Sequence, residues 1–186
     1  MDIAIFGGSF DPPHLGHQMA CLYALATQPI DALWIVPTHV HAFGKPLTPF
    51  EHRLEMCRRM AEPFGARVVV SDVERVRGGV SRTADTVRYL LANYPAARFS
   101  LVIGADLLAE VPTWYDGQAL PQLVSFLVIG RGGYDGGEEL AMPAVSSTEV
   151  RRRLATGAPC QHLVPRRVLE YVSEHGLFTG AALVTA

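Results

Sequence analysis

Residues 3–17 read IAIFGGSFDPPHLGH, and this stretch decides the fold. The apolar run at 3–6 predicts a buried strand, which Gly7 and Gly8 end. A helix is expected from Leu15 to Thr27, after the turn. A buried strand that leads through a glycine turn into a helix is typical of the first unit of a parallel α/β sheet.

The rest of the chain repeats this alternation. Further strands are expected at 33–36, 67–71, 99–103 and 123–129. Further helices are expected after Thr48, taken as the N-cap, at 83–93, after Ser146 and at 165–175. Because the strands are apolar throughout, both faces of the sheet need a cover. The sequence therefore predicts a doubly wound (Rossmann-like) parallel sheet with helices on both faces. It forms a single domain at 1–180 with a helical C-terminal portion at about 146–178, followed by a tail at 181–186.

Composition narrows the class of protein. The 186 residues are 49% hydrophobic and 18% charged, which indicates a folded domain rather than a disordered chain. A net charge of −2 argues against broad binding to nucleic acid or to an anionic membrane. The cysteines have no CxxC spacing, no apolar run reaches membrane-spanning length and residues 1–10 do not resemble a signal peptide. We therefore expect a cytoplasmic protein; its oligomeric state, a homo-oligomer included, stays open.

The loop after the first strand is expected to bind an anion. In open α/β sheets, ligands bind at the carboxyl ends of the strands. The glycines at 7 and 8 allow the backbone N–H groups of Gly8, Ser9 and Phe10 to approach a ligand closely. The helix that follows adds N-terminal N–H groups, which attract phosphate. Asp11 is interpreted as the N-cap of that helix.

A pair of histidines stands at the start of the same helix. His14 and His17 are three residues apart and share one helix face, and Gly16 leaves room for a bulky group beside them. Two imidazoles in this place can donate to a polyphosphate and stabilise the charge that develops on a transferring phosphorus. An alternative is a zinc site in a regulatory protein, with His39 and His41 as the other ligands.

A second anion-binding pattern is VSSTEVR at 145–151. Its spacing predicts a capping box between Ser146 and Glu149. Three hydroxyl groups can donate to phosphate oxygens at the start of the helix: those of Ser146, Ser147 and Thr148. Arg151, about one turn further on, can clamp an anion with its planar fork. Arg152 and Arg153 are expected in solvent.

Both patterns point to one family. GGSFDPPHLGH at 7–17 resembles the G-[ST]-F-D-P-x-H-x-G-H signature of adenylyltransferases in the HxGH nucleotidyltransferase superfamily, and 145–151 resembles its ISSTxIR motif. Within the superfamily the chain is most similar to the nicotinate mononucleotide adenylyltransferases. Further stretches carry this similarity over nearly the whole chain: 50–56, 104–106, 113–115, 131–134, 162–165 and 171–177.

The resemblance implies adenylyl transfer from ATP to nicotinate mononucleotide, which gives deamido-NAD and pyrophosphate in NAD biosynthesis, with Mg²⁺ carried by ATP. It implies that Gly104 and Asp106 contact ATP, and that Thr83 and Trp114 contact the acceptor. The residues expected in catalysis are His14, His17, Lys45 and Arg151. Those expected to bind ATP are Gly8, Ser9, Phe10, His14, His17, Gly104, Asp106, Ser146, Ser147, Thr148 and Arg151. Those expected to bind the acceptor are Lys45, Thr83, Trp114 and Arg131, the last from its place after a strand. No protein cage for a metal is expected.

The chain departs from the family pattern at two places. The family's PPHK stretch corresponds to PTHVHAFGK at 37–45, where Lys45 is expected to replace the usual lysine. A Ser-Tyr-Thr triplet corresponds to residues 81–83, with Arg82 in place of tyrosine. Because these changes fall where the acceptor is expected, nicotinamide mononucleotide and phosphopantetheine stay open as alternative acceptors. A nucleotide-binding sensor without catalytic activity is an alternative of another class.

Overall fold

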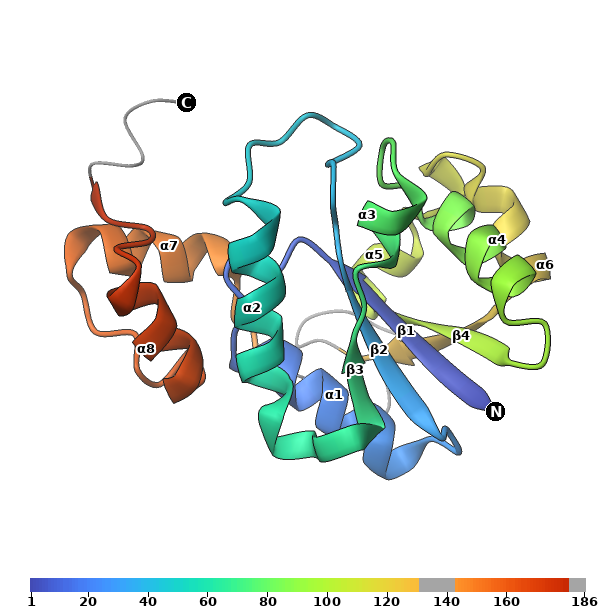
Figure 1. Ribbon diagram of the computed structural model, residues 1–186, viewed down its shortest axis with the longest axis horizontal. Coiled ribbons are helices and arrows are strands. Elements are labelled where there is room, and N and C mark those ends of the chain that lie inside the picture. Colours follow the sequence, from blue (N-terminus) through green and yellow to red (C-terminus); the bar gives the residue numbers. More distant parts are fainter. Residues whose placement is uncertain (131–142, 181–186) are drawn as a thin grey trace.

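The structure is a computed structural model that describes residues 1–130 and 143–180 (Figure 1). Its centre is a parallel sheet of five strands in the order β3-β2-β1-β4-β5. The strands are β1 (Asp2–Gly8), β2 (Ala32–Pro37), β3 (Val68–Val70), β4 (Arg98–Gly104) and β5 (Ser125–Ile129). The predicted doubly wound fold is confirmed.

Helices cover both faces of the sheet, and the strands alternate their side chains between the two. Ile3 and Ile5 of β1 enter one apolar cluster, whereas Ala4 enters the other. The cluster around Ala4 is closed by α1 (Leu15–Thr27), α2 (Phe50–Ala61), α7 (Ser147–Thr156) and α8 (Arg166–Glu174). The opposite cluster is closed by α3 (Val73–Arg77), α4 (Thr83–Asn93), η2 (Val111–Thr113) and α6 (Leu120–Leu123). Short elements complete the order: η1 (Glu62–Arg67), α5 (Ala105–Leu108) and η3 (Gly117–Ala119).

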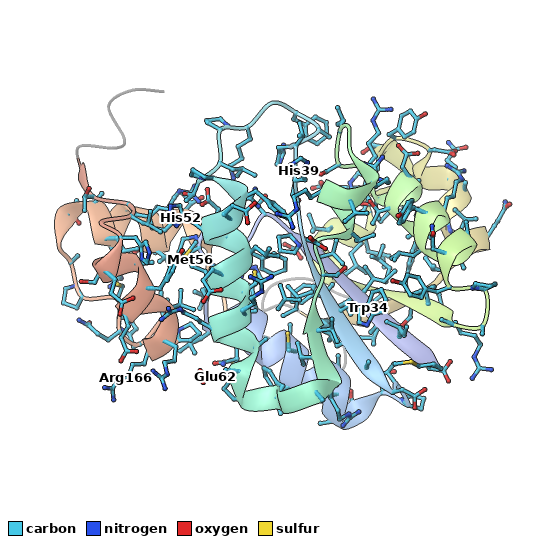
Figure 2. All side chains as sticks on the ribbon, viewed as in Figure 1. Trp34, His39, His52, Met56, Glu62 and Arg166 are labelled. Atoms are coloured by element: carbon cyan, nitrogen blue, oxygen red, sulfur yellow. The ribbon has the colours of Figure 1, made fainter. Side chains whose placement is uncertain are left out.

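Helices α7 and α8 lie beyond α2, away from the sheet (Figure 1). His52 of α2 points toward α8, where its Nδ1 lies 2.9 Å from the hydroxyl oxygen of Tyr171 (Figure 2). Met56, one turn further along α2, is fully buried in the core. Thus α2 packs between the sheet and the C-terminal helices. Every helix of residues 1–130 and 143–180 is too short or too polar to cross a membrane.

The strand order opens a crevice at the carboxyl ends of the strands. The chain runs outward from β1 to β3 and then returns to place β4 on the other side of β1. The strand order therefore reverses between β1 and β4, and the loops that follow these two strands diverge. This is the place where the sheet exposes backbone and side chains to a ligand.

Several local predictions need correction. The helix expected after Thr48 begins at Phe50, and Pro49 occupies the N-cap. The Thr48 carbonyl instead accepts a hydrogen bond from Arg53 Nε at 2.8 Å, so Thr48 ends a loop rather than starting the helix. The strand expected at 123–129 is shorter, because Leu123 is the last residue of α6 and Val124 is its C-cap. The five-residue helix α3 was not predicted from the sequence.

The start of α7 follows the predicted capping box in part. Ser146 Oγ accepts a hydrogen bond from the Glu149 N–H at 3.2 Å. The Glu149 carboxylate does not return to the N-cap but accepts hydrogen bonds from Arg152 and Arg153, which lower its pKa to about 2. Arg152 is exposed as expected, whereas Arg153 is partly buried and also donates to the carbonyl of Pro159 at 2.8 Å, so the expectation that it lies in solvent is wrong.

We predict that Ser146→Ala lowers the free energy of unfolding by about 1 kcal/mol, because it removes the N-cap acceptor. Urea unfolding monitored by circular dichroism measures the change. Ser173→Ala, at an exposed position of α8, is the matched control. Equal stability of the two variants would contradict the capping role.

Candidate active site

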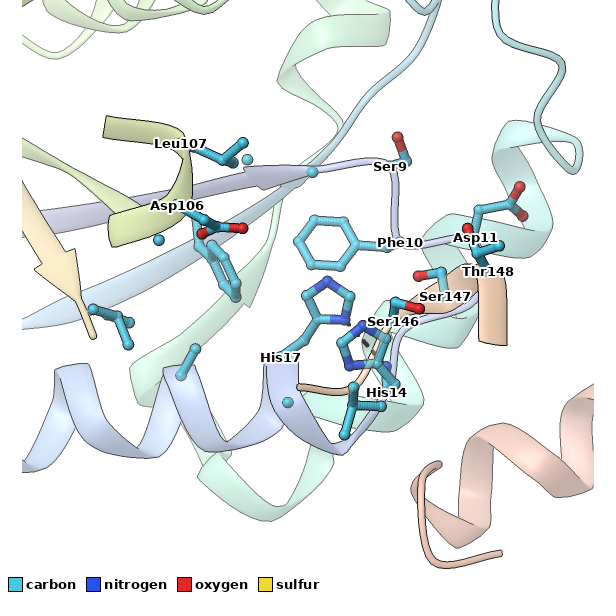
Figure 3. Close-up of a pocket in the computed structure, with 18 of the residues that line it drawn as sticks. Ser9, Phe10, Asp11, His14, His17, Asp106, Leu107, Ser146, Ser147 and Thr148 are labelled. Atoms are coloured by element: carbon cyan, nitrogen blue, oxygen red, sulfur yellow. Dashed lines mark hydrogen bonds between the residues drawn. The ribbon is translucent and has the colours of Figure 1, made fainter. Parts of the chain in front are cut away.

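A cavity of about 390 Å³ lies at the reversal point of the sheet (Figure 3). Its walls come from the carboxyl ends of β1, β4 and β5 and from the first turns of α1 and α7. All residues predicted to bind ATP line this one cavity, together with Lys45. They are Gly8, Ser9, Phe10, His14, His17, Gly104, Asp106, Ser146, Ser147, Thr148 and Arg151. The fold thus brings together stretches that lie far apart in the sequence.

The two histidines are stacked on each other. Their ring centroids are 3.7 Å apart with an angle of 28° between the planes. The His14 backbone N–H donates to His17 Nδ1 at 3.2 Å. Since Nδ1 of His17 accepts, the proton of its neutral ring sits on Nε2, which makes Nε2 a donor. His14 occupies the N-cap of α1 and is 6% exposed.

Close packing fixes this pair. A Cβ at Gly16 would come within 3.1 Å of the His14 ring, so the room left by this glycine is taken by His14 itself and not by a ligand. The Phe10 ring packs 4.8 Å from the His17 ring, and Phe6 meets Phe10 edge-on at 5.5 Å. Phe10 is buried with φ of 48°, a left-handed conformation that is uncommon for a residue other than glycine. The turn therefore places an aromatic ring behind the histidines.

The second motif is bound directly to the first. Ser147 Oγ donates to the carbonyl of Pro12 at 2.9 Å, although the two residues are 135 positions apart. Arg151 Nη1 donates to the carbonyl of Asp11 at 2.6 Å, and its Nη2 donates to Thr148 Oγ1 at 3.2 Å. These bonds fix the start of α7 against the loop after β1 and orient the guanidinium at the edge of the cavity.

Asp11 does not cap α1, and this prediction is wrong. The N-cap is His14, and the Asp11 side chain is turned toward α2 (Figure 3). It is 3% exposed, and its Oδ2 accepts from the Thr48 N–H at 3.4 Å. Beside it lies Arg53, a fully buried arginine that the sequence analysis did not single out. Its signal in the sequence is its helical register with Met56, Cys57 and Met60, all buried.

Gly104 and Asp106 form the opposite wall. Asp106 is the second residue of α5, and the N-cap of that helix is Gly104. A Cβ at Gly104 would overlap with the Asp106 carboxylate. The glycine therefore allows this carboxylate to lie over the end of β4, facing the histidines across the cavity (Figure 3).

A second cavity of about 360 Å³ adjoins the first. Both are lined by the end of β1, by Gly104 and by Leu107. The second cavity also contains the predicted acceptor residues Thr83 and Trp114. Trp114 is half-buried and packs on the apolar cluster of that face of the sheet. Arg131 lies outside the described residues.

Buried polar groups form the floor of the second cavity. Glu74, 8% exposed, accepts from the His39 N–H at 3.1 Å and from Thr86 Oγ1 at 3.1 Å. Ser81 Oγ accepts from the N–H groups of His39 and Val40 at 2.9 and 3.1 Å. Sequence reasoning missed Glu74, because it lies in α3, which was not predicted. These contacts fasten the loop after β2 to the wall of the cavity.

Arg82, which stands where the family has tyrosine, stacks on an aromatic ring. Its guanidinium carbon lies 3.8 Å from the centroid of the Tyr115 ring. Tyr115 follows Trp114, so the stack joins the two segments that carry the predicted acceptor residues. Arg82 thus makes a cation–π contact with Tyr115 beside Thr83, which lines the second cavity.

The four histidines of the zinc alternative do not form one group. His14 stacks on His17, whereas the His39 ring meets Phe50 edge-on at 5.0 Å at the end of β2 (Figure 2). Among residues 1–130 and 143–180, no cluster of three or more histidine, cysteine or acidic side chains could hold a metal ion.

Comparison with solved structures agrees with this topology. The fold is similar to that of a Plasmodium falciparum nicotinic acid mononucleotide adenylyltransferase complexed with NaAD, with a TM-score of 0.84. The match covers 95% of this chain and 97% of the other at 22% identity. At this identity the likeness supports the fold alone.

Sequence comparison identifies the family. Residues 5–153 match the model of the cytidylyltransferase-like family. The chain is 46% identical over 184 residues to a "probable nicotinate-nucleotide adenylyltransferase" of Anaeromyxobacter dehalogenans, covering 96% of this chain and 97% of the relative. It is 34% identical over 187 residues to the nicotinate-nucleotide adenylyltransferase of Bacillus subtilis, covering 95% and 97%. The chain therefore belongs to the cytidylyltransferase-like family and, within it, to the nicotinate-nucleotide adenylyltransferases.

Proposed function

We propose that the two adjoining cavities hold the two substrates of an adenylyl transfer, ATP in the first and nicotinate mononucleotide in the second. The chain catalyses transfer of the adenylyl group to the 5′-phosphate of the acceptor, which yields deamido-NAD and pyrophosphate. The observation that carries the assignment is the gathering of all predicted ATP-binding residues in one cavity. Trp114 and Thr83 line the adjoining second cavity, which shares the end of β1 with the first.

The reaction needs positioning and charge stabilisation. An oxygen of the acceptor phosphate forms a bond to the α-phosphorus of ATP while the bond between that phosphorus and the bridging oxygen breaks, and pyrophosphate leaves. The acceptor phosphate has a second pKa of about 6, so it is ionised at neutral pH and needs no side-chain base. Four residues carry the catalytic contacts in this proposal: His14, His17, Lys45 and Arg151.

Each group has a distinct task in the proposal. His17 Nε2 donates to the transferring phosphoryl group or to the leaving pyrophosphate, with His14 stacked beneath it. The hydroxyls at the start of α7 and Arg151 hold the β- and γ-phosphates. Lys45, which lines the first cavity, bridges the donor and acceptor phosphates. Trp114 offers a flat surface for the pyridine ring.

Mg²⁺ enters bound to ATP in this proposal. Among the described residues around the first cavity, Asp106 presents a carboxylate to it, and Mg²⁺ in such sites is held by substrate phosphates, water and one or two carboxylates. When bound, the ion neutralises charge on the phosphates. The three buried free cysteines support the proposal that the protein works in the cytoplasm, a reducing compartment.

The first test is an end-point assay of the wild-type protein with ATP and Mg²⁺. Nicotinate mononucleotide, nicotinamide mononucleotide and phosphopantetheine are supplied separately, and products are identified by mass. We expect deamido-NAD as the dominant product. Dominant NAD or dephospho-CoA would overturn the acceptor assignment, and absence of pyrophosphate with every acceptor would favour the sensor.

We predict that His17→Ala lowers kcat by about 100- to 1,000-fold, as expected for loss of one donor to developing charge. Thermal unfolding should stay close to that of the wild type. His162→Ala removes an exposed histidine near α8 and is the matched control. Near-normal turnover of His17→Ala would refute its role.

We predict that Trp114→Ala raises the KM for nicotinate mononucleotide roughly tenfold, because stacking of a base on an aromatic ring contributes about 1–3 kcal/mol. The KM for ATP should change little, since Trp114 does not line the first cavity. Trp34→Phe, in β2 and packed on Tyr94, is the control for a general effect of losing an indole. An equal rise of both KM values would contradict the placement of the acceptor.

A further inference from the structure

Arg53 is a charged side chain buried in α2 at 1% exposure. Burial of a guanidinium is costly unless its donors are used in good geometry. The cavities of the proposed active site do not explain this burial, because Arg53 lines neither of them. The hydrogen bonds of Arg53 explain its burial, because each of them is accepted by a loop that contributes to the site.

The guanidinium joins these loops through two backbone carbonyls. Arg53 Nη1 donates to the carbonyl of Ser9 at 3.0 Å, in the loop after β1. Arg53 Nε donates to the carbonyl of Thr48 at 2.8 Å, at the end of the loop that carries Lys45. The N–H groups of arginine form a rigid planar fork, so the two carbonyls are held at a fixed separation.

The loop between β2 and α2 is fastened at both of its ends. At its start, buried Glu74 and Ser81 accept the N–H groups of His39 and Val40. At its end, Thr48 is held by its carbonyl to Arg53 and by its N–H to Asp11 Oδ2, at 3.4 Å. Burial lowers the pKa of Arg53, and among the surrounding charges Asp11 opposes this lowering most. The segment between these two ends carries Lys45.

We propose that Arg53 is a positioning residue for adenylyl transfer, which sets the separation between the ATP-binding loop at Ser9 and the loop that presents Lys45. The inference rests on the proposed function, because Lys45 is there assigned to the donor and acceptor phosphates. Arg53 contacts no substrate. It acts through the placement of two loops whose groups must meet one phosphorus, and such transfer is sensitive to displacements of about 1 Å.

The test is a double-mutant cycle with Arg53→Lys and Lys45→Ala. A lysine keeps the charge but has no planar fork, so it cannot hold both carbonyls in the same way. We expect Arg53→Lys to lower kcat by about 100-fold in the otherwise wild-type protein, with the KM for ATP changed less than about threefold. In the Lys45→Ala background the same substitution should lower kcat by less than about threefold, because the two residues act as one unit.

Arg59→Lys is the matched control on the same helix. Arg59 pairs with Glu55 and lies over the Tyr171 ring at 4.7 Å, on the side of α8. Its substitution should leave kcat unchanged. Near-UV circular dichroism verifies that each variant is folded before kinetics are measured.

Two results would overturn the inference: full activity of Arg53→Lys, or equal losses of kcat in the presence and absence of Lys45. If Arg53→Lys does not fold, Asp11→Asn takes its place in the cycle, because it weakens the hold on Thr48 from the other side. The same non-additivity is then expected, and additive losses would again refute the proposal. Failure of the proposed function has a separate signature, since the wild-type protein would then form no deamido-NAD.

Discussion

Backbone carbonyls in the loop after β1 hold the site together. Together with the carbonyl of Gly8, the last residue of β1, three of them accept hydrogen bonds from other segments: those of Ser9, Asp11 and Pro12. The donors lie in three other segments: the N–H of Thr38 after β2, Arg53 in α2, and Arg151 and Ser147 in α7. In a trans peptide the N–H points away from the carbonyl of the same unit. Anchoring the carbonyls of Gly8 and Ser9 therefore directs the N–H groups of Ser9 and Phe10 to the opposite side.

This arrangement explains why the loop is rich in proline. The carbonyls of Asp11 and Pro12 belong to peptide units whose nitrogen comes from a proline and carries no hydrogen. Anchoring these two carbonyls therefore leaves no backbone N–H that would need a partner. The donors that remain belong to the residues that line the first cavity. A loop whose dipoles are fixed by the surrounding protein does not have to reorganise when charge develops on a phosphate, and this preorganisation is the main source of electrostatic catalysis.

Sequence reasoning works where the helical periodicity of apolar residues is strong. The helices predicted at 15–27 and 83–93 have these bounds in the structure, although α4 also carries the buried Thr86 hydroxyl, which donates to Glu74. Thr48 and Asp11 are residue types that favour the N-cap position, and for that reason both were predicted as N-caps. In the structure they form hydrogen bonds outside the helices that they were expected to cap: Thr48 with Arg53 and Asp11 with Thr48. The burial of Arg53 was not predicted for a related reason. An arginine in an amphipathic helix is read as a solvated charge, and only its carbonyl partners, 44 and 5 residues away, explain its burial.

The segments that line the two cavities are held in place in different ways. Most groups around the first cavity come from the two motifs at 7–17 and 145–151, which are bound to each other through main-chain carbonyls, whereas Lys45, Gly104 and Asp106 come from other segments. The departures from the family pattern, at 37–45 and at Arg82, lie in the loop after β2 and before α4. These segments lie mostly next to the second cavity, although Lys45 lines the first. These segments are fastened by side-chain acceptors such as Glu74 and Ser81, which bind backbone N–H groups and therefore tolerate a change of side chain in the loop. The wall of the second cavity can thus vary in its side chains while the backbone of the loop stays fastened.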